Sequence, residues 1–333
     1  MKNPIKILTI VFLVVFLFPG CVKQETVEVG FLIHALDRER WENDRDYFVE
    51  KVQELGGNVQ VRIADNKADK QLAQAIELLA NGVDVLVVVP VDQFAAADIV
   101  KEAHDRGVKV ISYDRLIKNC KLDFYVSTDN VEIGALQANY LTTIKPKGNY
   151  ALIGGALSDN NSQFLYLGQR NVLQPLVEKG DINIVYNEFT EAWEEDEGYE
   201  HAKKILSTNG DVDAIIAAND DIAYGVIRAV REAGKQGEIL IAGMDADLRN
   251  LQEIVAGHQT CTVYKPYEKL ASTAAEIALN MASNGSDEKT FQTISNGERL
   301  VPVIFHDAMI VNRENLQLTV ISEGYRTEEE VFK

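Results

Sequence analysis

The chain has 333 residues, of which 46% are hydrophobic and 25% are charged, and its formal net charge is −18. The length predicts about two domains, and the composition excludes a disordered chain. The acidity, without any basic cluster, argues against a nucleic-acid partner, because a phosphate backbone would repel this chain. Three cysteines are too few for a disulfide framework. We expect Cys120 and Cys261 to be packed thiols, and whether they pair is left open.

The first 21 residues have the pattern of a signal peptide. Lys2 and Lys6 precede an apolar run at 7–18, which is too short to span a bilayer as an ordinary helix. A glycine and Cys21 follow, which resembles the signal of bacterial lipoproteins, whose cysteine is lipidated. We therefore predict a lipoprotein-type signal peptide at 1–21 and an extracytoplasmic protein anchored to the membrane by lipid on Cys21. Plain secretion is the alternative.

Downstream of this segment, apolar strand patterns alternate with helical patterns. The strand runs are apolar on both faces, which is typical of parallel sheets covered by helices on both sides. In chain order we expect strand 27–33, helix 40–55, strand 59–63, helix 67–80, strand 83–90, helix 93–106, strand 108–113 and a short strand 124–127.

The same alternation then starts again, which predicts a second half of similar architecture. We expect helix 132–144, strand 150–153, helix 163–178, strand 182–187, helix 195–207, strand 214–218, helix 222–233, strand 239–242, strand 260–264, helix 267–282 and a last strand near 308–311.

Together these patterns predict an α/β fold of two doubly wound parallel-sheet lobes. The chain is expected to cross between the lobes three times, near Ser127, Thr262 and Val301. The expected N-terminal lobe comprises 26–127 plus 263–300, and the expected C-terminal lobe comprises 128–262 plus 301–333.

Polar and aromatic side chains gather just after the strands of both halves. In open α/β sheets, ligands bind beyond the carboxyl ends of the strands. We therefore expect these side chains to surround a cleft between the lobes. The candidate binding residues are Arg40, Trp41, Asp114, Arg115, Asn160, Asn161, Trp193, Asn219, Asp245 and Lys265.

This inventory matches the chemistry of a sugar. A hydroxyl group both donates and accepts hydrogen bonds, and carboxylates, amides, guanidinium and ammonium groups supply the complementary partners. Indole rings offer flat apolar faces to the C–H face of a sugar ring. Glycine-rich phosphate-binding motifs are absent from the sequence. Taken singly, Asp220 and Asp247 are better explained as helix N-caps, and the two tryptophans as packed core residues.

The sequence offers little for catalysis. The five histidines are scattered without metal-ligand spacing, and no G-x-S-x-G motif is present. We therefore predict no catalytic residue, no metal and no cofactor. Asp114 and Asp245 form a carboxylate pair that would suit a glycosidase, which is kept as a minor alternative.

The strand-end motifs, taken in order, resemble those of the periplasmic sugar-binding proteins of ABC importers, the ribose, galactose and xylose type, and most closely the D-xylose-binding proteins. The motifs are "ERWENDRD" (39–46), "GVDVLVVVP" (82–90), "YDRLI" (113–117), "DFYVSTDN" (123–130), "DNN" (159–161), "AANDD" (217–221), "GMDADL" (243–248) and "QTCTVYKP" (259–266).

This resemblance implies a monosaccharide ligand, D-xylose above all, held in the cleft by hinge closure. Trp41 and Trp193 would pack against the sugar ring, and the other eight candidates would hydrogen-bond it. The implied partner is the permease of an ABC importer. An alternative is a sensing module that docks on a membrane histidine kinase. A LacI-type repressor core shares the fold, but it requires an N-terminal helix-turn-helix where the signal peptide stands. Departures at His34 and Met244 leave the identity of the sugar open.

Overall fold

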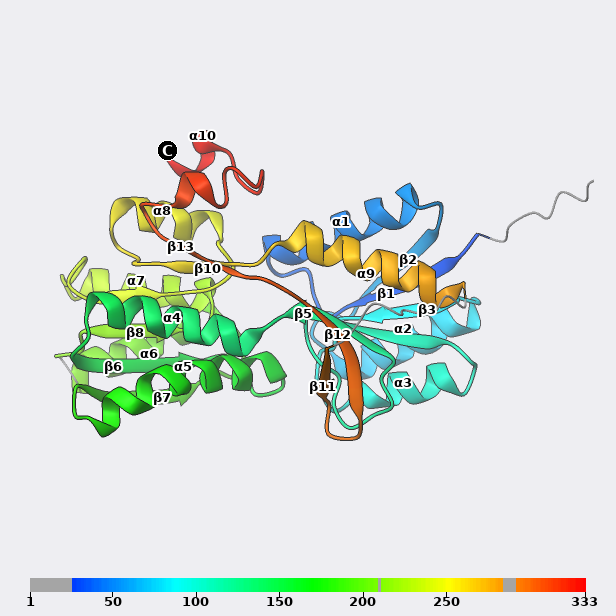
Figure 1. Cartoon of the computed structure of the whole chain (residues 1–333), viewed down its shortest axis with the longest axis horizontal. Coiled ribbons are helices and arrows are strands. Elements are labelled where there is room, and N and C mark those ends of the chain that lie inside the picture. The colour runs from blue at the N-terminus through cyan, green and yellow to red at the C-terminus, as the bar shows by residue number, and fades with distance from the viewer. Residues whose placement is uncertain (1–25, 209–210, 284–291) are drawn as a thin grey trace, which may run out of the picture.

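The computed structural model describes residues 26–208, 211–283 and 292–333. The expected signal peptide and Cys21 lie outside these residues. Within the described ranges, no helix is long and apolar enough to cross a membrane. The chain forms two α/β lobes side by side, connected by several segments that pass between them (Figure 1).

The N-terminal lobe is built on a seven-stranded sheet in the order β11-β12-β5-β4-β3-β1-β2, in which only β11 runs antiparallel to its neighbour. Helices α1 and α9 pack on one face, and α2 and α3 pack on the other. The bounds are β1 Glu28–Ile33, α1 Glu39–Glu54, β2 Asn58–Ile63, α2 Ala68–Ala80, β3 Val85–Val88, α3 Ala97–His104, β4 Lys109–Tyr113, β5 Phe124–Thr128, α9 Tyr267–Ala282, β11 Thr293–Ser295 and β12 Leu300–His306.

The C-terminal lobe has a parallel four-stranded sheet in the order β7-β6-β8-β9, with α4 and α5 on one face and α6 and α7 on the other. A two-stranded ribbon of β10 and β13 adjoins it. The bounds are α4 Asn130–Ile144, β6 Gly148–Gly154, α5 Asn160–Glu178, β7 Ile182–Phe189, α6 Glu195–Thr208, β8 Ala214–Ala217, α7 Asp220–Glu232, β9 Leu240–Ala242, α8 Leu248–Ala256, β10 Thr262–Tyr264, β13 Met309–Val311, a 3-10 helix Leu316–Leu318 and α10 Glu328–Val331.

The chain crosses between the lobes three times, but two expected boundaries are wrong by a few residues. Residues 263–264 pair with β13 and therefore belong to the C-terminal lobe. Residues 301–306 belong to the N-terminal lobe, because β12 continues to His306 alongside β5. The local pattern hides β12, since its partner is remote in sequence and Pro302 is a residue that strands disfavour.

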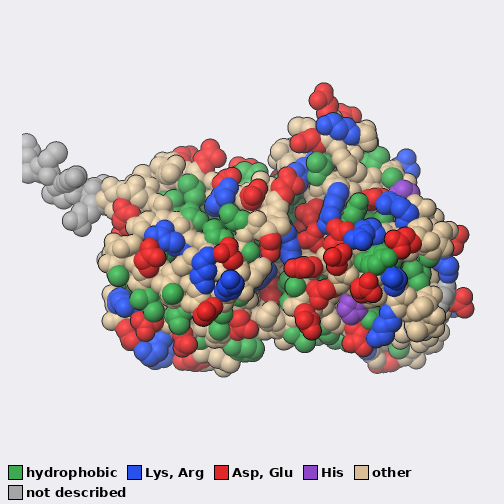
Figure 2. Space-filling view, turned by 180° about the vertical axis from the view of Figure 1, so that it is seen from behind, with side chains coloured by type: hydrophobic (Ala, Val, Ile, Leu, Met, Phe, Trp, Pro, Cys, Tyr) green, Lys and Arg blue, Asp and Glu red, His purple; other side chains and the backbone are tan. Residues whose placement is uncertain are grey.

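The chain turns sharply where β4 and β9 end, and both turns lie at the junction of the lobes. Asp114 and Asp245 have φ angles of 59° and 111°, in the region that side-chain-bearing residues rarely adopt. Hydrogen bonds fix both backbones: Asp114 N donates to Val126 O at 2.8 Å, and Asp245 N donates to Val263 O at 2.8 Å. Acidic and basic side chains gather along the seam between the lobes (Figure 2). The strained turns point to a functional site at this seam.

Candidate functional site

A small cavity lies between the lobes, beyond the carboxyl ends of the strands. Eight of the ten expected residues line it: Arg40, Trp41, Asp114, Arg115, Asn161, Trp193, Asp245 and Lys265. Three further residues complete the lining: Arg38, Asp159 and Met244.

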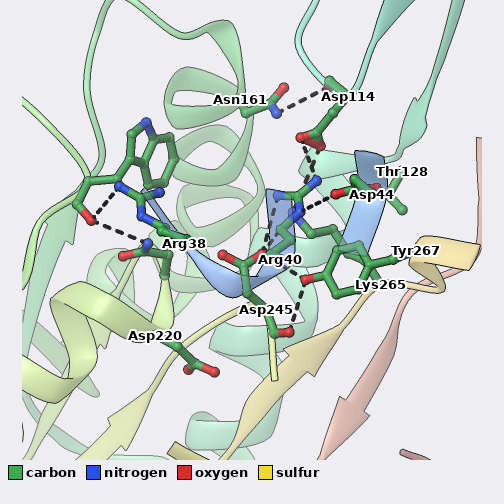
Figure 3. A network of polar contacts seen from close by, with 12 residues as sticks. Arg38, Arg40, Asp44, Asp114, Thr128, Asn161, Asp220, Asp245, Lys265 and Tyr267 are labelled. Carbon is green, nitrogen blue, oxygen red and sulfur yellow. Dashed lines mark hydrogen bonds and ion pairs between the residues drawn. The ribbon is translucent and has the colours of Figure 1, made fainter. Parts of the chain in front are cut away.

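Arg40 is the centre of a buried ion-pair network (Figure 3). Its Nη2 lies 2.7 Å from Asp114 Oδ2, its Nε 3.2 Å from Asp44 Oδ2, and its Nη1 3.5 Å from Asp245 Oδ1. Lys265 Nζ lies 2.9 Å from the same Asp245 oxygen. Since Arg40 comes from α1 and Asp245 follows β9, the network joins the two lobes.

These cations keep Asp114 charged. Burial alone would raise the pKa of Asp114, but Arg40 and Lys265 lower that pKa to about 2. Asp44 behaves differently, because burial outweighs Arg40 and raises its pKa to about 6. Asp114 is therefore a fixed anionic acceptor at neutral pH.

Several buried polar atoms around the cavity have no hydrogen-bond partner among the described residues. They are two acceptors, Asp114 Oδ1 and Asn161 Oδ1, and two donors, the Nε1 atoms of Trp41 and Trp193. Buried polar groups are almost always paired in folded proteins. A ligand with several hydroxyl groups would satisfy both kinds of atom at once, because each hydroxyl donates and accepts.

The two indole rings form walls of the cavity. Trp41 is 2% exposed and lies under the Arg40 guanidinium, 4.2 Å from its ring centroid. Trp193 packs against Gly155, where a Cβ atom would lie 2.3 Å from the indole Cζ3. A side chain at position 155 would collide with the indole, so Gly155, which directly follows β6, makes room for the ring.

Arg115 links the lobes through a second ion pair. Its Nε lies 2.9 Å from Asp159 Oδ2, and its Nη2 lies 3.2 Å from His34 Nε2. Burial and the nearby arginines, Arg115 first, lower the pKa of His34 well below its usual value. His34 is therefore a neutral acceptor for Arg115, since a guanidinium only donates.

Asn160 and Asn219, which were expected to bind the ligand, do not line the cavity. Asn160 Oδ1 accepts from Leu116 N at 2.8 Å across the cleft. Asn219 is the N-cap of α7, where its Oδ1 accepts from Ile222 N at 3.0 Å. Its Nδ2 donates to Trp193 O at 3.4 Å. Asn219 therefore holds the lining residue Trp193, and Asn160 holds the backbone directly after the lining residue Arg115.

The helix-cap interpretation is wrong for Asp220, and it holds for Asp247 only in position, because Asp247 is the N-cap residue of α8. Asp220 lies inside α7, is fully buried, and accepts from Gln259 and Thr262 at 2.9 Å. Asp247 precedes α8 but makes no side-chain cap hydrogen bond. Asp220 instead holds β10 and the segment after β9 against α7.

The expectations for cysteine chemistry agree with the structure. Cys120 and Cys261 are both buried and unpaired. Burial raises the pKa of the Cys120 thiol to about 11. Across residues 26–208, 211–283 and 292–333, no three His, Cys, Asp or Glu side chains are grouped so that they could hold a metal ion.

Three lining residues were missed from the sequence. Asp159 lies in the motif "DNN" and Met244 in "GMDADL", beside residues that were chosen, and Arg38 directly precedes the motif "ERWENDRD". Arg38 looks like one more charge on a solvated helix face, and Asp159 looks like an N-cap, which it also is, through Asn161 N. The only signal available for these three residues was their position within or directly beside one of the quoted motifs.

Comparison with known proteins places this geometry in a family. The model of a periplasmic binding protein domain matches residues 29–286. The D-xylose-binding periplasmic protein of Escherichia coli K12 is 40% identical over 306 residues, which is 92% of each chain.

Two solved structures share the fold over nearly the whole chain. A carbohydrate transporter solute binding protein from Chloroflexus aurantiacus, in complex with D-glucose, has a TM-score of 0.86 at 29% identity, covering 92% of this chain and 99% of that one. An ABC transporter solute binding protein from Clostridium phytofermentans, with bound β-D-glucose, has a TM-score of 0.83 at 25% identity, covering 91% and 99%. The two-lobed α/β fold predicted from the sequence is thereby confirmed, and the chain belongs to the family of periplasmic binding proteins.

Proposed function

We propose that this protein captures a monosaccharide, D-xylose above all, in the cavity between its lobes and presents it to the permease of an ABC importer. The observation that carries this proposal is the set of buried, unpartnered acceptors and donors between two indole rings. The 40% identity to a D-xylose-binding periplasmic protein supports the choice of sugar.

The lining residues have distinct roles in this proposal. Asp114 and Asn161 accept hydrogen bonds from sugar hydroxyls through their free oxygens. Arg40 and Lys265 hold the two aspartates in place and donate to the sugar. Trp41 and Trp193 pack on the ring faces. Arg115, Asn160 and Asn219 position these groups.

Hinge closure supplies the mechanism. Three crossings join the lobes, and groups from both lobes line the cavity. A ligand that contacts both lobes favours the closed state by its differential affinity for that state. Closure also removes water, which strengthens the charge-assisted hydrogen bonds to Asp114 and Asp245.

We propose no enzymatic role. A glycosidase needs one carboxyl group that is protonated near neutral pH to act as the general acid. With a pKa of about 2, Asp114 stays ionised and cannot be that acid, and the relative reported above is a binding protein. Incubation with xylo-oligosaccharides, followed by product analysis, should leave the oligosaccharides intact.

The lipid anchor on Cys21 is also part of the proposal, since a tethered binding protein stays close to its permease. Full-length protein should fractionate with membranes, and Cys21→Ser should be found in the soluble extracytoplasmic fraction. Soluble wild-type protein would favour plain secretion. The comparisons do not favour the alternative of a module that docks on a sensor kinase.

The decisive experiment is calorimetric titration of a lipid-free form of the protein, starting at Val22, with D-xylose, ribose, arabinose, glucose and galactose. Tight one-to-one binding of D-xylose and weak binding of the others is the expected result. Preference for another of these sugars would retain the class of ligand and reassign the specificity. Failure of every sugar to bind a folded protein would overturn the proposed function.

A further inference from the structure

Arg38 lies between the sugar cavity and the outside of the molecule. Its side chain lines the inner cavity together with Trp193 and Asp245. The same side chain lines two outer grooves, which also contain Asp221 and Arg249. The Arg38 side chain therefore separates the small inner cavity from the outer grooves.

Residues of the opposite lobe hold the Arg38 side chain in place. Arg38 stands at the N-cap of α1 in the N-terminal lobe. Its Nε lies 2.7 Å from Asp221 Oδ2, and its Nη2 donates to Trp193 O at 3.0 Å. Both partners belong to the C-terminal lobe, so these contacts form only when the lobes close.

Other residues of the C-terminal lobe fix the position of Asp221, the ion-pair partner of Arg38. Asp221 also contacts Arg249, whose Nη1 lies 2.5 Å from Glu195 Oε2. The Arg38 and Asp221 side chains are each 17% exposed, so solvent screens this ion pair only in part. The Arg38 guanidinium thus closes against a fixed carboxylate beside one wall of the cavity.

We propose that Arg38 closes the cavity over the bound sugar and restricts the ligand to a single, unsubstituted ring. This inference rests on the proposed function. Shortening the side chain would join the cavity to the outer groove and create room for a substituent. It would also remove two contacts that exist only in the closed state, so the bound sugar would leave faster.

The neighbouring residue provides a matched control. Glu39 pairs with Arg326 across the same seam, with oxygen–nitrogen distances of 2.6 and 2.8 Å, but neither residue lines the cavity. Glu39→Gln therefore weakens a contact between the lobes without joining the cavity to the outer groove. Arg38→Lys keeps a charge near Asp221 with a smaller head group.

The test compares wild type, Arg38→Ala, Arg38→Lys and Glu39→Gln. The probes are D-xylose, xylobiose, the two methyl xylosides, and xyloses methylated at O2, O3 or O4, so that each hydroxyl position of the ring is extended at least once. Calorimetry gives the affinities, and stopped-flow displacement gives the dissociation rate of xylose. Circular dichroism establishes that each variant is folded.

We expect Arg38→Ala to bind at least one extended probe about tenfold more tightly, relative to xylose, than wild type does. Xylose should also dissociate about tenfold faster from this variant. Arg38→Lys should be intermediate, and Glu39→Gln should leave the ratio of affinities as in wild type. Unchanged ratios for every probe in Arg38→Ala would overturn the inference. Absence of any sugar binding by wild type would instead overturn the proposed function.

Discussion

The segments that follow β4 and β8 each place an aspartate close to the carboxyl end of a buried parallel strand, and the two aspartates have different surroundings. Asp114, after β4, has a φ of 59° and faces Arg40 and Lys265. Those cations lower its pKa to about 2 against the effect of burial, and one of its oxygens has no hydrogen-bond partner within the described chain. It is 1% exposed.

Asp220, after β8, is as deeply buried as Asp114, but no Lys or Arg of the described residues forms an ion pair with it. Both its oxygens accept hydrogen bonds, from Gln259, Thr262 and Asp247 N. Burial, with Asp247 nearby, raises its pKa well above the usual value. The comparison teaches that a strand-end aspartate serves a ligand when cations keep it charged and its neighbours leave an oxygen free. With its acceptors saturated, it stabilises the lobe.

Replacing Asp114 should produce the largest effect. Asp114→Ala leaves Arg40 and Lys265 without one buried partner, and removing one member of a buried ion pair costs about 3–5 kcal/mol. We expect xylose affinity to fall at least about 100-fold by calorimetry. Affinity within threefold of wild type, in a folded variant, would remove Asp114 from the site.

Asp245 should be the next most sensitive position, because it shares Lys265 with Asp114 and also accepts from Tyr267. Asp245→Ala removes charge-assisted hydrogen bonds worth about 1.5–3 kcal/mol, or a tenfold to hundredfold loss of affinity. Tyr267→Phe is the matched control, since it loses the hydroxyl that donates to the carbonyl oxygen and Oδ1 of Asp245 and keeps the carboxylate. An unchanged titration curve for Asp245→Ala would show that the sugar does not use it.

Replacing Asp220 should affect stability rather than binding. Asp220→Ala removes the acceptor of three hydrogen bonds, from Gln259, Thr262 and Asp247 N. A buried donor that is left unpaired costs about 1–3 kcal/mol. Urea unfolding should therefore show a lower free energy of unfolding by at least that amount. Affinity for xylose should stay within about threefold of wild type. A large loss of affinity with normal stability would erase the distinction between the two aspartates.

The smallest expected effect is the pH dependence of the stability that Asp220 contributes. Because the pKa of Asp220 is raised in the folded state, folding takes up a proton, and stability from this group grows as the pH falls. The gap in unfolding free energy between wild type and Asp220→Ala should therefore widen from pH 8 to pH 5, by at most about 1.4 kcal/mol per pH unit.

The contribution of Asp114 to stability changes with pH in the opposite direction. Its pKa is depressed, so its contribution is complete above the unfolded value near 4 and is lost only as the pH falls towards 2. The difference in unfolding free energy between wild type and Asp114→Ala should therefore stay constant between pH 8 and pH 5. Parallel curves for the two variants would contradict the assigned charge states.

The sequence predicts which residues line the cavity better than it predicts the contacts that each of them makes. Strand ends and motif order identified Asp114, Asp245 and the two tryptophans, because ligand groups in this fold follow the strands. The local pattern did not separate Asn161, which lines the cavity, from Asn160, which faces Leu116 N. Adjacent residues of one helix turn differ only in direction, which packing decides.

Long-range pairing was the second limit. The position of β12 depends on β5, and the role of Arg38 depends on Asp221 in the other lobe. Neither contact leaves a periodic signal in the sequence near the residues involved. The charged run around Arg38 is equally compatible with a solvated helix face.

The pairing of β12 with β5 also determines how the chain completes its fold. β5 ends at Thr128, yet its partner strand begins only at Leu300, after the whole C-terminal lobe sheet. Contacts so distant in sequence form late and slow the search for the native state. The lobe that begins the chain is thus among the last parts to be finished, and β5 keeps an open edge until then. A polypeptide cut short before β12 would consist of two incomplete lobes, so the lobes are separate in space but not in folding.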